Sequence, residues 1–377
     1  MGNGFMSLAT CVLLWTGAAA AQETMDAGVT APEAGLPVEP APSAREAFFR
    51  ALPLSVGVFG NFDGTASGQG HPSFVLGGVD LFLTSQPYRK LNLLAELVFE
   101  AGSDQNFVVD VERVSATWLF DRLLRVTVGR IHQALGYYNA AYHHGAYLAN
   151  TIERPAAVAF EDGGGILPVH AIGIEAAGDL DFGNFSLGYN LTVSNGRGRF
   201  QDEILNVRDL NPSKAVLGAI TLSQIDWGVR IGLNALYDRI PTELDADGAT
   251  LRPPQDEMLL GAHLLIDTDV VWFLAEGYLV DHTSTALGKR RTIGFFAEGR
   301  VNFRPVYAYA RFDLISHDEQ IDPFYDLTAP LPSTRSVLLG LGWKVISGLV
   351  LKVEAAVDFP QGLPVSPSGR AQLAWSL

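Results

Sequence analysis

The stretch "DWGVRIGLNALYD", Asp226 to Asp238, alternates apolar and polar side chains with a period of two. Apolar residues occupy every odd position from Trp227 to Tyr237, whereas Arg230 and Asn234 lie between them. Successive side chains of a β-strand point to opposite faces, so the stretch is predicted to be a strand with one apolar and one polar face.

The same alternation recurs from Leu54 to the C-terminus and gives about 16 candidate strands. Most are about 10 residues long or slightly longer, which is enough for a tilted strand to cross a bilayer. The predicted strands are residues 54–62, 73–84, 90–100, 107–119, 123–132, 168–179, 182–194, 213–224, 226–238, 256–268, 269–281, 291–302, 304–315, 334–346, 348–358 and 369–377.

The connections between these strands are alternately short and long. Tight turns such as "FDRL", from Phe120, and "ISG", from Ile346, alternate with longer polar connections rich in Gly, Pro or Asp. This arrangement is typical of a transmembrane antiparallel β-barrel with short periplasmic turns and long external loops. A soluble β-sandwich or propeller is the competing fold, but it has no need for regular alternation of loop length.

The N-terminal region has a different composition. Residues 1–21 combine an apolar run with "TGAAAA" and are predicted to be a signal peptide cleaved near Gln22. Residues 22–47 form a Pro/Ala/Glu-rich linker that cannot build a core. The barrel is therefore assigned to residues 48–377. The only cysteine, Cys11, lies inside the signal, so no disulfide is expected in the mature chain.

The longest interruption of the strand pattern runs from Gly136 to His170, "GYYNAAYHHGAYLANTIERPAAVAFEDGGGILPVH". It follows the fifth predicted strand and is therefore the third external loop. Glu153, Glu161 and Asp162 supply negative charge, and the glycines that follow allow a tight reversal. We expect this loop to fold inward and narrow a pore, with an external lid as the alternative.

Positive charge is predicted on the opposite side of the pore. By strand alternation, four arginines share the lumen face: Arg125, Arg230, Arg300 and Arg311. Together with the three loop acids they form the predicted constriction, in which Glu161 and Asp162 face Arg125 and Arg230. Charges of opposite sign across a narrow aqueous path would orient dipolar solutes.

Two short segments leave the orientation of their arginines open. "VERVS" around Arg113 and "VGRIH" around Arg130 both break the alternation, and we expect a β-bulge in each.

In strand number, loop order and the place of the long loop, residues 54–377 resemble the general porins of Gram-negative outer membranes. Members of that family are trimeric 16-stranded barrels whose third loop folds into the pore. More loosely, "GRIHQALGYYN", Gly129 to Asn139, followed by a long acidic loop, resembles the phosphate-selective porin group.

The resemblance implies a water-filled pore in the bacterial outer membrane for passive diffusion of small hydrophilic solutes or ions. It also implies a homotrimer in contact with membrane lipid and lipopolysaccharide. The net charge of −15 disfavours nucleic acid as a partner, and the acidic external loops predict a weak preference for cations.

Enzyme motifs are weak throughout the chain. No G-x-S-x-G segment exists, and His143–His144 lacks the spacing of a metal site. We therefore predict no catalytic residue, no cofactor and no metal. The alternative functions are a non-conducting barrel that serves as adhesin, receptor or assembly scaffold, and an outer-membrane barrel enzyme.

Overall fold

The computed structural model describes residues 54–67, 71–101, 106–142, 145–161, 163–201, 203, 207–244, 247–286, 288–318, 322–326 and 332–377. The predicted signal peptide and linker lie outside these residues, as do His143, His144 and Asp162. None of the described helices is long and apolar enough to cross a membrane.

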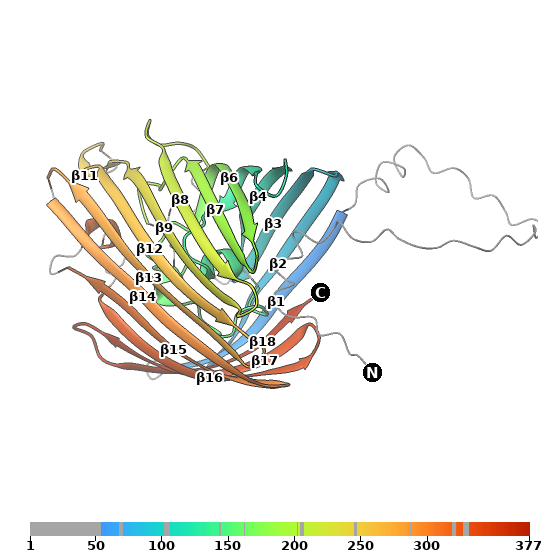
Figure 1. The fold of residues 1–377 in the computed structure, drawn as a ribbon. Helices are drawn as coiled ribbons and strands as arrows, with labels where there is room; N and C mark the ends of the chain where they lie inside the picture. The colour runs from blue at the N-terminus through green and yellow to red at the C-terminus, as the bar shows by residue number, and fades with distance from the viewer. Residues whose placement is uncertain are drawn as a thin grey trace, which may run out of the picture. The chain divides into compact units, whose positions relative to one another are not determined.

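Sixteen antiparallel strands close into one barrel, which Figure 1 shows as a continuous wall. The barrel strands are β1 (Leu54–Ser67), β2 (Ser73–Tyr88), β3 (Leu91–Ala101), β4 (Phe107–Leu119), β5 (Arg125–His132), β6 (His170–Phe182), β7 (Phe185–Ser194), β8 (Ala215–Gln224), β9 (Val229–Ile240), β12 (Gln255–Asp267), β13 (Val271–Ser284), β14 (Gly288–Phe303), β15 (Val306–His317), β16 (Thr334–Ile346), β17 (Leu349–Pro360) and β18 (Ser366–Ser376). Short elements in the loops are the helices α3 (Tyr138–Ala141) and α4 (Pro323–Asp326), the 3₁₀ turn η1 (Ala156–Val158), and a hairpin of β10 (Glu243–Leu244) and β11 (Thr250–Arg252).

The predicted fold class is confirmed. Each predicted strand corresponds to one barrel strand, and the first and last strands pair with each other, for example Phe59 with Ser376. Among the described strands, this closure leaves the barrel without an unpaired edge, which would be costly in lipid. The β10–β11 hairpin was not predicted, because its strands are too short to show a period.

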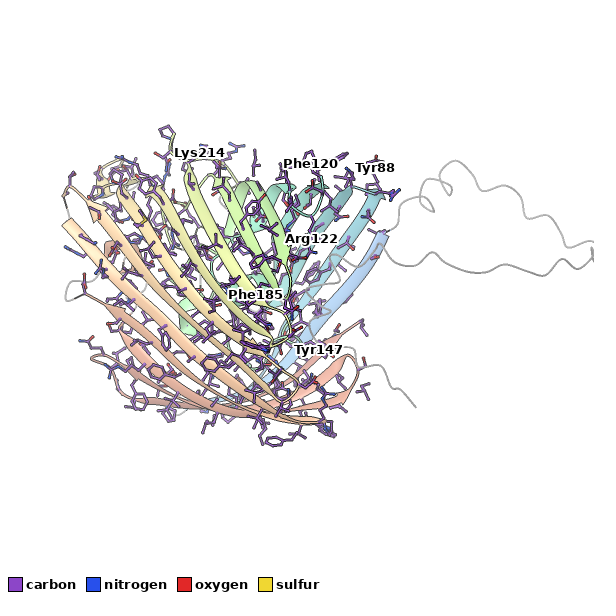
Figure 2. The ribbon with its side chains drawn as sticks, viewed as in Figure 1. Tyr88, Phe120, Arg122, Tyr147, Phe185 and Lys214 are labelled. Atoms are coloured by element: carbon purple, nitrogen blue, oxygen red, sulfur yellow. The ribbon has the colours of Figure 1, made fainter. Side chains whose placement is uncertain are left out.

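The two faces of the wall differ as the alternation predicts. On β9, Ile231 and Leu233 are 51% and 54% exposed, whereas Asn234, which follows Leu233, is 6% exposed. Figure 2 shows side chains on both faces, and the labelled Phe185 at the start of β7 is also exposed. An apolar face turned outward around a closed barrel suits hydrocarbon, whereas a soluble sandwich would bury that face in a core.

Arginine should therefore be costly at outward positions and tolerated at inward ones. We expect Ile231→Arg to destabilise the barrel by about 2–4 kcal/mol if the position lies near the bilayer midplane, and Asn190→Arg, at a partly buried inward position of β7, to cost much less. Equilibrium unfolding from lipid vesicles measures both variants. Equal losses would contradict the assigned faces.

One of the two expected bulges is present. The β3–β4 register passes from Glu96 opposite Arg113 to Leu97 opposite Val111, so Glu112 is the extra residue. Arg113 consequently points inward, where it forms an ion pair with Glu96.

The prediction of a β-bulge around Arg130 was wrong. The β5 pairings with β4 and β6 show no register shift. The irregularity comes instead from Gly129, whose φ is +128°, a value that side chains rarely allow.

Candidate channel and its inward loop

The segment between β5 and β6, residues 133–169, is called L3 below. L3 folds into the barrel as predicted, and carboxylates on the inward wall accept hydrogen bonds from its backbone. Glu276 Oε1 on β13 accepts from the backbone N–H groups of Tyr137 and Tyr138, at 2.6 and 2.8 Å. Three further bonds run from Gly145 N to Asp80 at 2.9 Å, from Ile152 N to Glu354 at 3.0 Å and from Ala156 N to Asp313 at 3.1 Å.

Basic side chains of the same wall bind the carbonyl groups of L3. Arg311 on β15 donates to the carbonyl oxygens of Glu153 at 2.6 Å and Arg154 at 3.1 Å. Lys352 on β17 donates to the carbonyl oxygen of Thr151 at 3.1 Å. The wall therefore supplies partners to both donors and acceptors of the loop backbone, as a buried irregular segment requires.

L3 also packs on an apolar part of the lumen wall. Leu135, Tyr138 and Ile166 of L3 are at most 2% exposed and belong to one cluster with inward side chains of β8, β9 and β12–β15. Phe296 on β14 meets the Tyr138 ring edge-on, with 5.7 Å between the ring centroids. This half of the interior is a packed core, so L3 is part of the folded barrel rather than a tethered lid.

Arg154 stabilises the fold of L3 itself. Its guanidinium lies over the rings of Phe160, at 4.2 Å, and Tyr138, at 5.2 Å. It also donates to the carbonyl oxygens of Tyr142 at 2.8 Å and Val158 at 3.0 Å. One cation thereby joins α3, η1 and the turn before the glycine run.

The wall formed by β5–β8 is more open to solvent. On β5 and β6, the inward side chains of Arg125 and Asp179 form an ion pair at 2.9 Å and remain 33% and 40% exposed. The inward residues Glu175 on β6 and Asn190 on β7 are also only partly buried. Along β12–β15, by contrast, almost every inward position is buried. Water therefore reaches a polar strip on this part of the wall, formed by Arg125, Glu175, Asp179 and Asn190.

The predicted constriction residues occupy two settings. Arg125 and Arg230 lie on inward positions bordering the polar strip, and Glu153 of L3 forms an ion pair with Arg370 while remaining 49% exposed. Arg300 and Arg311 are instead buried against L3, where Arg300 donates to Asn150 and Arg311 to the loop carbonyls.

The predicted placement of Glu161 opposite Arg125 was wrong. Glu161 Oε1 accepts from the backbone N–H of Val169 at 2.7 Å, and Glu161 lines a small cavity with His170. His170 begins β6 at the long-loop end, whereas Arg125 is opposite Ala177, about 23 Å further along the strand. L3 has returned to the barrel rim at Glu161 in order to enter β6.

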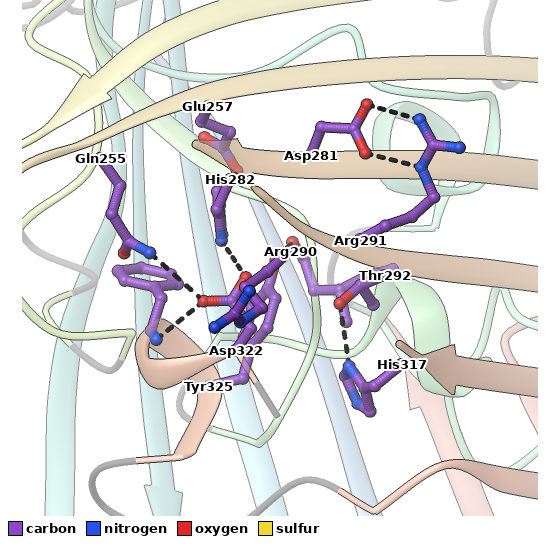
Figure 3. Close-up of polar contacts among 12 residues, drawn as sticks. Gln255, Glu257, Asp281, His282, Arg290, Arg291, Thr292, His317, Asp322 and Tyr325 are labelled. Atoms are coloured by element: carbon purple, nitrogen blue, oxygen red, sulfur yellow. Dashed lines mark hydrogen bonds and ion pairs between the residues drawn. The ribbon is translucent and has the colours of Figure 1, made fainter. Parts of the chain in front are cut away.

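A polar cluster at the long-loop end of the barrel, called the rim cluster below, was not predicted from the sequence. Glu257 on β12 accepts both from Arg197, at 3.0 and 3.1 Å, and from His282 on β13, at 3.3 Å. His282 Nδ1 lies 2.5 Å from Asp322, which precedes α4, as Figure 3 shows. Arg197 Nη2 and the Tyr325 hydroxyl both donate to the carbonyl oxygen of Ile166 in L3. These bonds join three loops at the rim: L3, the loop after β7 and the loop after β15.

Asp322 is held ionised within this cluster. Burial acts to raise the pKa of the Asp322 carboxyl, but the His282 ring and the backbone N–H of Phe324 outweigh it. The pKa therefore lies below its ordinary value. A charged carboxylate bonded to His282 favours the docked position of α4.

No protein-family model matches the chain, and no curated protein matches it by sequence. Solved structures match its fold. The outer membrane channel DcaP of Acinetobacter baumannii aligns over 87% of this chain and 98% of its own, with 9% identity and a TM-score of 0.62. An anion-selective porin from Comamonas acidovorans aligns over 86% and 100%, with 11% identity and a TM-score of 0.57. OmpT, an outer membrane protein of Vibrio cholerae, aligns over 87% and 98%, with 8% identity and a TM-score of 0.58. The chain therefore has the fold of bacterial outer-membrane porins, a closed 16-stranded antiparallel barrel.

Proposed function

We propose that the chain is a porin-like channel of the bacterial outer membrane through which small hydrophilic solutes and ions diffuse passively. The polar strip on β5–β8 supports this most directly, because its inward charges remain accessible to water beside a firmly packed L3. In this proposal Arg125, Arg230 and Glu153 flank the passage, while Arg300 and Arg311 position the loop. No catalytic residue or cofactor is assigned.

Planar-bilayer recording of the purified protein tests this function. We expect stable unitary current steps in potassium chloride, because the passage is polar and L3 is fixed. The negative control is the same protein left unfolded, which should give no current steps. Silence from preparations with full strand content by circular dichroism would contradict the channel.

We further propose that the channel weakly prefers cations. Glu153 and Glu175 are partly accessible acids near the passage. Converting both to Gln should shift the reversal potential under a salt gradient towards the anion side with little change of conductance. Asp318→Asn, in the exposed loop after β15, is the control and should shift it less, since salt screens an open mouth. An equal shift for both variants would contradict a role for these acids.

The pH dependence follows from Glu153. Burial raises the pKa of the Glu153 carboxyl, while Arg370 acts in the opposite direction. Glu153 should therefore lose its charge at a higher pH than an ordinary glutamate as the solution is acidified. Cation preference should fall in the same range, and the Glu153→Gln channel should lack that step in a reversal-potential titration.

Assembly and targeting complete the proposal. OmpT of Vibrio cholerae has been solved in a trimer form, and we propose a homotrimer whose outward face contacts lipid and lipopolysaccharide. Residues 1–21 would direct export, and residues 22–47 would link the mature N-terminus to the barrel. Membership of the phosphate-selective group stays a prediction. Cross-linking in native outer membranes would detect the trimer.

The packed apolar cluster inside the barrel favours one alternative. A lumen filled by its own loops suits a non-conducting adhesin, receptor or scaffold. The same recordings separate the two functions, because such a barrel would fold and give no unitary steps.

A further inference from the structure

Three polar side chains of β9 and β12 share one patch of the lumen wall, next to the point where L3 enters. The register places Gly232 opposite His263 and Asn234 opposite Gly261. A Cβ atom on Gly232 would lie 2.0 Å from His263 Cε1, and one on Gly261 would lie 2.4 Å from Asn234 Oδ1. The two glycines therefore give His263 and Asn234 the room to lie flat on the wall beside Arg230.

The polar atoms of this patch are largely unused by the protein. His263 and Asn234 are 9% and 6% exposed, yet among the described residues neither ring nitrogen of His263 nor Oδ1 of Asn234 has a hydrogen-bond partner. Arg230 donates from Nε to Ser223 Oγ at 3.1 Å, and its terminal nitrogens have no partner within the described part of the chain. Buried polar atoms of this kind normally have partners, because leaving them unsatisfied costs about 1–3 kcal/mol each.

The patch borders the water-accessible side of the barrel. The inward residues Thr221 and Ser223, on the neighbouring strand β8, are only partly buried. On the other side, Tyr137 of L3 contacts both Arg230, at 5.3 Å from ring centroid to Cζ, and His263, at 6.2 Å between centroids. A solute in the passage could reach the guanidinium while L3 holds that group in place.

We infer that Arg230, His263 and Asn234 form a binding subsite for a small monocarboxylate solute, an inference that rests on the proposed channel function. The planar fork of the guanidinium matches the two oxygens of a carboxylate. A neutral His263 can add one N–H donor, and Asn234 offers an amide for a polar substituent. The patch carries one cation, and the carboxylates of Glu276, opposite His263, and Asp267 lie near it, so a single negative charge fits better than a phosphate dianion.

The test combines a binding measurement with a conductance measurement. Acetate is titrated against detergent-purified protein and its binding read from NMR line broadening, with acetamide as the uncharged isostere and inorganic phosphate as the competing anion. We expect acetate to bind with a dissociation constant of about 1 mM, and acetamide and phosphate at least about tenfold more weakly.

Variants locate the binding. Arg230→Gln should weaken acetate binding at least about tenfold. His263→Phe should weaken it several-fold without lowering the unfolding free energy, because an apolar ring has no nitrogen to satisfy. The matched control is Arg122→Gln, which removes one positive charge from an exposed turn between β4 and β5 and should leave acetate binding unchanged.

The outcomes separate the subsite from the channel. Acetate binding that survives in Arg230→Gln, or phosphate binding stronger than acetate binding, would overturn the subsite. A protein that conducts potassium chloride but does not bind acetate would also overturn it and leave the channel intact. A protein that binds acetate through Arg230 without conducting would sustain the subsite and refute the channel.

Discussion

Replacing Phe296 by alanine is expected to lower the unfolding free energy of the barrel by about 3–5 kcal/mol, the usual cost of deleting a fully buried aromatic ring. Phe296 points into the lumen from β14 and is 0% exposed. It packs against Tyr138, and a Cβ atom on the neighbouring inward Gly294 would lie 2.8 Å from Ala157 Cβ of L3. L3 is too tightly seated to fill the space left by the ring.

The matched control is Phe295→Ala. Phe295 is the adjacent residue on β14 and points outward beside Phe312, with 6.4 Å between the ring centroids. Lipid chains can fill the space left there, so the loss should be clearly smaller. Urea unfolding from vesicles, followed by intrinsic fluorescence, compares the two variants. A Phe296→Ala loss no larger than that of Phe295→Ala would show that L3 is a loose lid.

The alternation of side chains was sufficient to predict the wall but not its contents. The period of two in "DWGVRIGLNALYD" assigns Arg230 and Asn234 inward and Ile231 outward, as the structure confirms. This works because the strand period is a local property of the backbone. Whether an inward residue meets water or a packed loop depends on the path of L3, which no local pattern specifies.

Glu161 and the rim cluster show this limit most clearly. The composition of L3 predicts an acidic loop, but the position of Glu161 along the barrel axis depends on where the chain turns back towards β6. Arg197, Glu257, His282 and Asp322 come from four separate elements, and their contacts exist only once the loops close over the rim. The bulge at Glu112 was predictable because it interrupts a local period.

Arg311→Met should lower the unfolding free energy about as much as Phe296→Ala, but for an electrostatic reason. Arg311 is 4% exposed, and its guanidinium pairs with Asp313 at 2.7 Å and Glu298 at 3.6 Å. Removing it leaves two buried carboxylates without this cation, and breaking a buried ion pair from one side costs about 3–5 kcal/mol. The loop also loses the donors to the carbonyl oxygens of Glu153 and Arg154.

A loss of stability alone would not distinguish a residue that holds L3 in place from an ordinary buried charge. Arg311→Met is therefore assayed for the accessibility of L3 as well as for stability, and it is compared with a variant in which the two carboxylates are also neutralised. Arg311→Met should make L3 sensitive to protease in folded vesicles and add noise to the open-channel current. Adding Asp313→Asn and Glu298→Gln removes the orphaned charges and should recover most of the unfolding free energy, but not the protection of L3, because the donors to its carbonyl groups remain absent. Full recovery of both would limit Arg311 to charge neutralisation, whereas recovery of stability alone identifies it as the side chain that holds the loop against the wall.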